Sequence, residues 1–227
     1  MAFLSIPDFA ALAFFVVAWG AYAGVIEWSE HGRGGLNAEM DTYRDAWMRQ
    51  MLARQNRIVD TQITAALQNG NAFFASTSLI AVGGALTLLR STDEMITVFG
   101  ALPFGIAATR AEWETKTLGL AIIFVYAFFK FAWSYRLFNY VAILLGAAPP
   151  IEEKDTAEAL AHARRTAKLS EEAGRHFNRG QRAFFLALGY LGWFIGPLVL
   201  IGTTIAVVVV IWRRQFASDA RQAVFDE

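Results

Sequence analysis

Four long apolar stretches with few charged residues divide the chain. They cover about residues 9–28, 71–89, 118–138 and 183–212. A helix needs about 20 mostly apolar residues to cross the hydrocarbon core of a bilayer. The pattern therefore predicts an all-α, polytopic membrane protein with four transmembrane helices, which form a single membrane domain over residues 1–227.

Two long hydrophilic segments, at about residues 37–66 and 151–178, are predicted to be helical and cytoplasmic. In the first, the apolar positions recur at intervals of three and four residues, as Met40, Tyr43, Trp47, Met51 and Leu52. This spacing predicts a helix, which either lies at the level of the lipid headgroups or packs against the second segment. The second segment begins with acidic residues and continues with basic ones, an order that suits the helix dipole and favours a solvent-exposed helix.

Basic residues are distributed unequally between the two sides that the spans define. Twelve lie in the connections between the first and second spans and between the third and fourth. Six lie on the other side, among them Arg213 and Arg214, which oppose the assignment. Because Lys and Arg accumulate in cytoplasmic loops, we expect both long segments on the cytoplasmic side of the membrane and both termini outside. The expected membrane is the bacterial inner (plasma) membrane. Residues 1–8 contain no Lys or Arg, so we interpret the first stretch as an uncleaved span rather than a signal peptide.

The loop between the second and third stretches contains a further apolar run at residues 95–108. This run is too short to span a bilayer. It forms either a re-entrant segment, whose backbone must be buried in protein or line a cavity, or a cap over the helix ends.

Composition excludes several classes of function. Hydrophobic residues make up 56% of the chain and the formal net charge is zero, which favours the lipid bilayer as partner and argues against nucleic acid. The absence of Cys excludes disulfides and thiolate chemistry. No catalytic or nucleotide-binding motif is present, and His162 and His176 would lie about 21 Å apart along one helix. We therefore expect no catalytic residue, no metal and no cofactor.

A lysine inside the third stretch is the strongest candidate for function. Lys130 lies twelve residues after Leu118, near mid-bilayer, and no Asp or Glu lies inside a span to neutralise it. Such a group normally faces the bundle or a water-filled path, where it attracts an anion; alternatively, it snorkels to the cytoplasmic headgroups. The candidates for a pore or ion path are Lys130, Ser134, Gln68, Asn71 and Ser76. The polar residues of the second span have a second interpretation, as hydrogen-bonding contacts between helices.

Two pairs of glycines with small-xxx-small spacing lie in the first and fourth stretches. The pairs are Gly20 with Gly24, and Gly192 with Gly196. Such spacing lets helices approach closely, so these residues are expected to serve helix packing or self-association.

Three motifs resemble a known family. Residues 177–185 (Phe-Asn-Arg-Gly-Gln-Arg-Ala-Phe-Phe), 193–197 (Trp-Phe-Ile-Gly-Pro) and 212–216 (Trp-Arg-Arg-Gln-Phe) resemble the membrane-protein family catalogued as domain of unknown function 599. Asn71 in the second span is also similar to the pattern of that family, although Gly70 stands where the family usually has Arg. The resemblance extends over nearly the whole chain. It implies an integral membrane protein with about four helices and implies no activity.

Two functional hypotheses follow. In the first, a homo-oligomer forms a channel or conduit for a small ion or solute, which Lys130 would attract as an anion. In the second, the chain is a non-catalytic accessory subunit or assembly factor of a larger membrane complex, whose partners are other membrane subunits. An enzyme acting on lipid would need an acid–base cluster, for which only Glu27, Glu30 and His31 are candidates.

Overall fold

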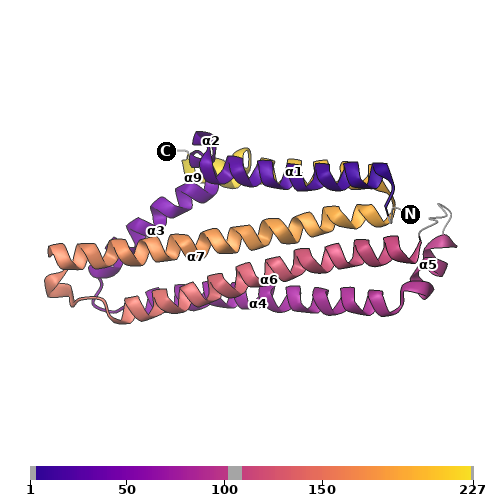
Figure 1. The fold of residues 1–227 in the computed structure, drawn as a ribbon. Helices are drawn as coiled ribbons and strands as arrows, with labels where there is room; N and C mark the ends of the chain where they lie inside the picture. Colours follow the sequence, from indigo (N-terminus) through magenta and orange to yellow (C-terminus); the bar gives the residue numbers. More distant parts are fainter. Residues whose placement is uncertain (1–3, 102–108, 226–227) are drawn as a thin grey trace.

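Long helices run lengthwise through the molecule in the computed structural model, which describes residues 4–101 and 109–225, without the side chains of His31 and Arg33 (Figure 1). The long ones are α1 (Ile6–Trp28), α4 (Ile58–Arg90), α6 (Arg110–Gly146), α7 (Ala157–Tyr190) and α8 (Pro197–Phe216). The shorter ones are α2 (Glu30–Arg33), α3 (Leu36–Leu52), α5 (Thr92–Gly100), η1 (Ile151–Glu153), η2 (Leu191–Phe194) and α9 (Asp219–Phe225). The predicted all-α fold is confirmed for the described residues.

Four helices in the described part of the chain are long and apolar enough to cross a membrane. They are Ile6–Trp28, Ile58–Arg90, Arg110–Gly146 and Pro197–Phe225, with hydropathies of 2.1, 1.8, 1.6 and 1.7 over their most apolar windows. The predicted number of membrane helices therefore agrees with the structure.

The fourth predicted span, at about residues 183–212, is not one helix. It contains the end of α7, the turn η2 and most of α8, and the chain reverses direction before Pro197 (Figure 1). The side chains of this turn are buried, with Trp193 1% and Phe194 7% exposed. Because the turn is therefore made of apolar residues, the sequence continues as one apolar stretch through it. Pro197 occupies the start of α8, where its missing N–H has no helical partner to lose, so it begins a helix rather than kinking one.

The predicted hydrophilic segments also have different boundaries. Residues 37–66 form α3, a short connection and the beginning of α4, while residues 151–178 are followed without a break by the rest of α7. At 1.5 Å per residue, α4 and α6 are about 50 and 55 Å long, well beyond the roughly 30 Å of a hydrocarbon core. Both helices therefore continue past the membrane.

A second hydrophobic core holds these continuations together. Its members from α3, α6 and α7 include Met48, Met51, Val141, Leu145 and Ala163. We call this part of the molecule the helical extension: α3, the first half of α4, the second half of α6 and the first half of α7. Since α3 packs against α7, the part of its apolar stripe formed by Trp47, Met51 and Leu52 serves a helix contact, one of the two interpretations of the sequence. Tyr43 of the same stripe is 53% exposed.

The two termini lie at opposite ends of the bundle (Figure 1). Helices α1 and α8 run parallel, since Tyr22 and Trp212, each near the end of its helix, have ring centroids 6.3 Å apart. The final part of α7 runs antiparallel to both and supplies an additional passage through the bundle. Four spans alone would place both termini at the same end, whereas with this additional helix the two termini lie at opposite ends of the bundle.

Candidate functional site

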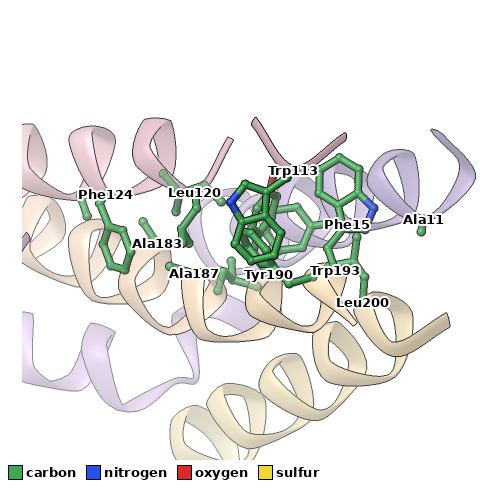
Figure 2. Packing of buried hydrophobic residues seen from close by; sticks show 14 of the residues in the cluster. Ala11, Phe15, Trp113, Leu120, Phe124, Ala183, Ala187, Tyr190, Trp193 and Leu200 are labelled. Carbon is green, nitrogen blue, oxygen red and sulfur yellow. The ribbon is translucent and has the colours of Figure 1, made fainter. Parts of the chain in front are cut away.

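Aromatic side chains fill the apolar part of the bundle (Figure 2). Tyr190 contacts Phe15 and Trp193 with ring centroids 5.4 and 5.3 Å apart, and Phe131 stacks on Phe74 at 5.2 Å. Of these side chains, Phe131 is 0% exposed and Trp193 is 1% exposed. A single copy is therefore packed along this part of its length, and polar groups gather at the two ends of the packed region.

A buried ion pair lies at the end where α1 begins. Asp8 caps α1 together with Ser5 and accepts a hydrogen bond of 2.7 Å from Trp193 Nε1. Lys116 Nζ lies 3.8 Å from the same carboxylate, and both side chains are almost completely buried. We call these four residues the Asp8 cluster. The sequence did not single out Asp8 or Lys116, because each precedes its predicted span by one or two positions. The signal that could have identified Asp8 is its capping-box spacing with Ser5.

A second charged cluster lies where α1 ends. Glu27 accepts hydrogen bonds of 2.9 and 2.6 Å from Arg179 and one of 2.5 Å from Arg182. The two arginines are three residues apart on α7 and therefore share one helix face. Arg182 is only 9% exposed. Both belong to the motif at residues 177–185. The sequence indicated only their contribution to the distribution of basic residues and not their pairing with Glu27.

Lys130 lies beside this pair of arginines. A cavity of about 230 Å³ is lined by Trp19, Ala23, Glu27, Tyr126, Lys130, Arg179 and Arg182, and we call it the Lys130 pocket. Lys116 is at the level of Asp8, and four helical turns, about 21 Å, separate it from Lys130. The two lysines therefore lie near opposite ends of the packed region.

Lys130 contacts an aromatic ring rather than an acidic side chain. Its Nζ lies 5.1 Å from the ring centroid of Tyr126, and within the described part of the chain no carboxylate forms an ion pair with it. Glu27 is already bound by two guanidinium groups. The pocket thus contains three cations and one carboxylate, an excess of two positive charges.

A larger cavity of about 380 Å³ adjoins the same pair on the side of α3. Its lining includes Arg175, Arg179 and Arg182, but also Glu27 and Asp41. Burial raises the pKa of the Asp41 carboxyl, and the guanidinium of Arg44 opposes that rise. With a second acid in its lining, this cavity is less positive than the Lys130 pocket.

The other pore candidates are not brought together. Ser134 donates a hydrogen bond of 2.7 Å to the carbonyl of Ala173, and Gln68 donates one of 2.7 Å to Asn139. Asn71 is buried and donates to the carbonyl of Leu67 at 2.8 Å, whereas Ser76 is exposed. Three of the four thus make contacts within or between helices, and none of the four lines the Lys130 pocket.

The predicted packing glycines have different surroundings. An added Cβ at Gly192 would collide with the Thr203 side chain, so this residue permits the close approach of η2 and α8. No atom lies within 4 Å of the Cβ position at Gly20 or Gly196, and Gly24 has only the Trp28 ring nearby. Gly180, which the sequence analysis did not single out, packs against the ring of Phe131.

Two further expectations concern chemistry. Among the residues proposed for a lipid enzyme, Glu27 is held by the two arginines, and the His31 side chain lies outside the described residues. In the described part of the chain, no group of three or more His, Asp or Glu side chains could hold a metal ion.

The apolar loop at residues 95–108 is only partly described. Met95, Ile96 and Phe99 lie in α5 and pack against the bundle core. The rings of Phe99 and Trp113 contact each other with centroids 5.0 Å apart. Residues 102–108, on which the re-entrant interpretation depends, lie outside the described residues.

Comparison with known proteins tests the family assignment. No curated protein and no solved structure matches the chain. The family model described as "Protein of unknown function, DUF599" matches residues 10–220, a range that includes Glu27, Lys130, Arg179 and Arg182. Because the match extends over most of the chain, the resemblance found in the sequence is confirmed, and the chain belongs to the DUF599 family.

Proposed function

We propose that this chain is a non-enzymatic membrane protein that binds an anion in the Lys130 pocket. The observation that carries the proposal is the excess of positive charge in a partly enclosed space, with Lys130 lacking an acidic partner among the described residues. Charges at a membrane position are expensive unless they are paired or face a functional site. An oxyanion that enters the pocket would supply the missing partner.

A conduit, as in the first hypothesis, would have to run between copies. Within one copy, aromatic side chains occupy the region between the Asp8 cluster and the Lys130 pocket. Homo-oligomerisation is therefore part of the conduit proposal. Assembly, with copies or with other subunits, is also favoured by exposed apolar side chains on the helical extension, where Ile58 is 58% and Ile143 is 65% exposed.

We also propose a sidedness that differs from the sequence-based one. Arg213, Arg214 and Arg221, at the end of α8 and in α9, lie at the end of the bundle that carries the helical extension. With Lys130 and Arg136 of α6, seventeen of the 20 basic residues gather there, against three at the other end. The positive-inside rule then places the extension and the C-terminus in the cytoplasm and the N-terminus outside. Arg213 and Arg214, which opposed the sequence-based topology, then lie on the cytoplasmic side with the other basic residues.

Single-cysteine labelling tests this topology, because the chain contains no Cys. Thr115 and Ala220 are exposed and lie at opposite ends of the bundle. We expect a membrane-impermeant maleimide to label Thr115→Cys on intact cells and Ala220→Cys only after permeabilisation. Labelling of both variants on intact cells would contradict the proposal.

Anion binding is tested with the purified protein and inorganic phosphate. Calorimetric titration should show binding that Lys130→Gln weakens at least about tenfold, the loss of roughly one charge-assisted hydrogen bond. Lys154→Gln is the matched control, because Lys154 is exposed in the connection between α6 and α7 and does not line the pocket. Absence of binding to the folded wild-type protein, or equal weakening by both variants, would overturn the proposal.

A further inference from the structure

We propose that the anion is the headgroup phosphate of an anionic phospholipid, which enters the Lys130 pocket from the adjacent leaflet. This inference rests on the proposed anion-binding function and specifies its ligand. It is carried by the apolar surfaces that lead away from the pocket along two neighbouring helices.

On α6, one side of the helix changes from apolar to charged along its length. Ile122, Tyr126 and Lys130 recur at intervals of four residues and therefore form one stripe. Ile122 is 60% and Tyr126 is 40% exposed. The stripe thus offers an apolar surface to the bilayer and ends at the ammonium group.

A matching stripe runs along α1. Val16, Trp19, Ala23 and Glu27 recur at intervals of three and four residues, and Val16 is 58% exposed. The two stripes meet where the rings of Trp19 and Tyr126 contact each other at 5.7 Å. Both helices therefore present apolar side chains below the same basic pocket.

This arrangement matches the parts of a phospholipid. A phosphate would lie among Lys130, Arg179 and Arg182, and acyl chains would lie along the exposed apolar stripes. Trp and Tyr side chains such as Trp19 and Tyr126 are typical of the membrane–water interface, and basic pockets between membrane helices on the cytoplasmic side bind anionic headgroups. A free phosphate would use the same cations but would leave both stripes without a role.

Native mass spectrometry of the full-length protein in detergent distinguishes the two sources. The probes are phosphatidylglycerol, zwitterionic phosphatidylcholine and inorganic phosphate, each added at the same concentration. We expect retention of phosphatidylglycerol at least about tenfold above phosphatidylcholine, a loss of that preference in Lys130→Gln, and its recovery in Lys130→Arg, which keeps the charge. Lys154→Gln, the exposed control, should retain the lipid as the wild type does.

Each other outcome is informative. If inorganic phosphate binds and phosphatidylglycerol does not, the anion site stands and the lipid inference is overturned. If neither binds to the folded protein, both proposals fail. Equal retention of the two lipids, or a Lys130→Gln variant that keeps the preference, would also overturn the lipid inference.

Discussion

Asp8→Ala is expected to lower the free energy of unfolding by about 3–5 kcal/mol, the cost of leaving one member of a buried ion pair without its partner. The ammonium of Lys116, 6% exposed, and the indole N–H of Trp193 would both lose the carboxylate that they share. Thermal unfolding of the purified protein in detergent, followed by circular dichroism, measures the effect.

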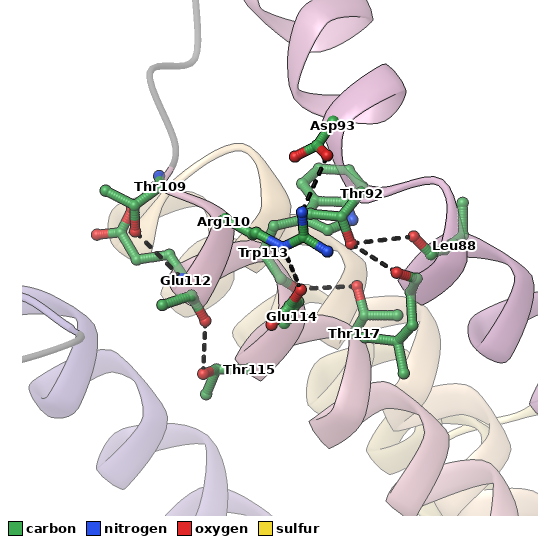
Figure 3. A network of polar contacts seen from close by, with 12 residues as sticks. Leu88, Thr92, Asp93, Thr109, Arg110, Glu112, Trp113, Glu114, Thr115 and Thr117 are labelled. Carbon is green, nitrogen blue, oxygen red and sulfur yellow. Dashed lines mark hydrogen bonds and ion pairs between the residues drawn. The ribbon is translucent and has the colours of Figure 1, made fainter.

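The control for this variant lies at the same end of the molecule. Asp93 pairs with Arg110 at 2.9 Å on the surface, with the two side chains 76% and 61% exposed (Figure 3). Asp93→Ala should therefore cost about 0–1 kcal/mol, as exposed ion pairs do. Adding Lys116→Met to Asp8→Ala should restore part of the lost stability, because it removes the unpaired charge. Equal losses in Asp8→Ala and Asp93→Ala would show that the buried pair does not hold this end of the bundle.

Gly180→Ala is expected to destabilise the protein by about 1–3 kcal/mol, the usual cost of forcing a methyl group into a packed core. The added Cβ would lie 2.7–2.9 Å from ring atoms of Phe131, which is 0% exposed and stacks on Phe74. The same unfolding measurement reports the loss.

Gly83→Ala is the matched control, since no atom lies within 4 Å of its Cβ position. This variant should be neutral or slightly stabilising, because alanine favours the helix over glycine. Phe131→Leu combined with Gly180→Ala should recover part of the stability by opening space for the methyl group. A Gly180→Ala protein as stable as Gly83→Ala would contradict the close contact between α6 and α7.

The candidate site was only half accessible from the sequence. Lys130 stands out locally because an ionisable residue in an apolar run is rare, and Glu27 was noted near the headgroups. The pairing of Glu27 with Arg179 and Arg182 joins residues more than 150 positions apart in the chain. No helical spacing within one segment predicts such a contact.

The break before Pro197 shows the same limit. Hydropathy averages over windows, so an apolar turn between two apolar helices reads as one long span; the reversal became visible only through the packing of Trp193 and Phe194 into the bundle. Because that reversal makes α8 run back along α7 and parallel to α1, it also changed the relation between the two termini.

The sequence by itself determined the membrane class, the helical fold, the number of strongly apolar helices and the family, because these depend on composition and on local periodicity. The tertiary structure alone decided where the chain reverses, how far the helices continue beyond the membrane, and which charges meet. Those features depend on contacts between distant segments, whose energies exist only after the helices have packed.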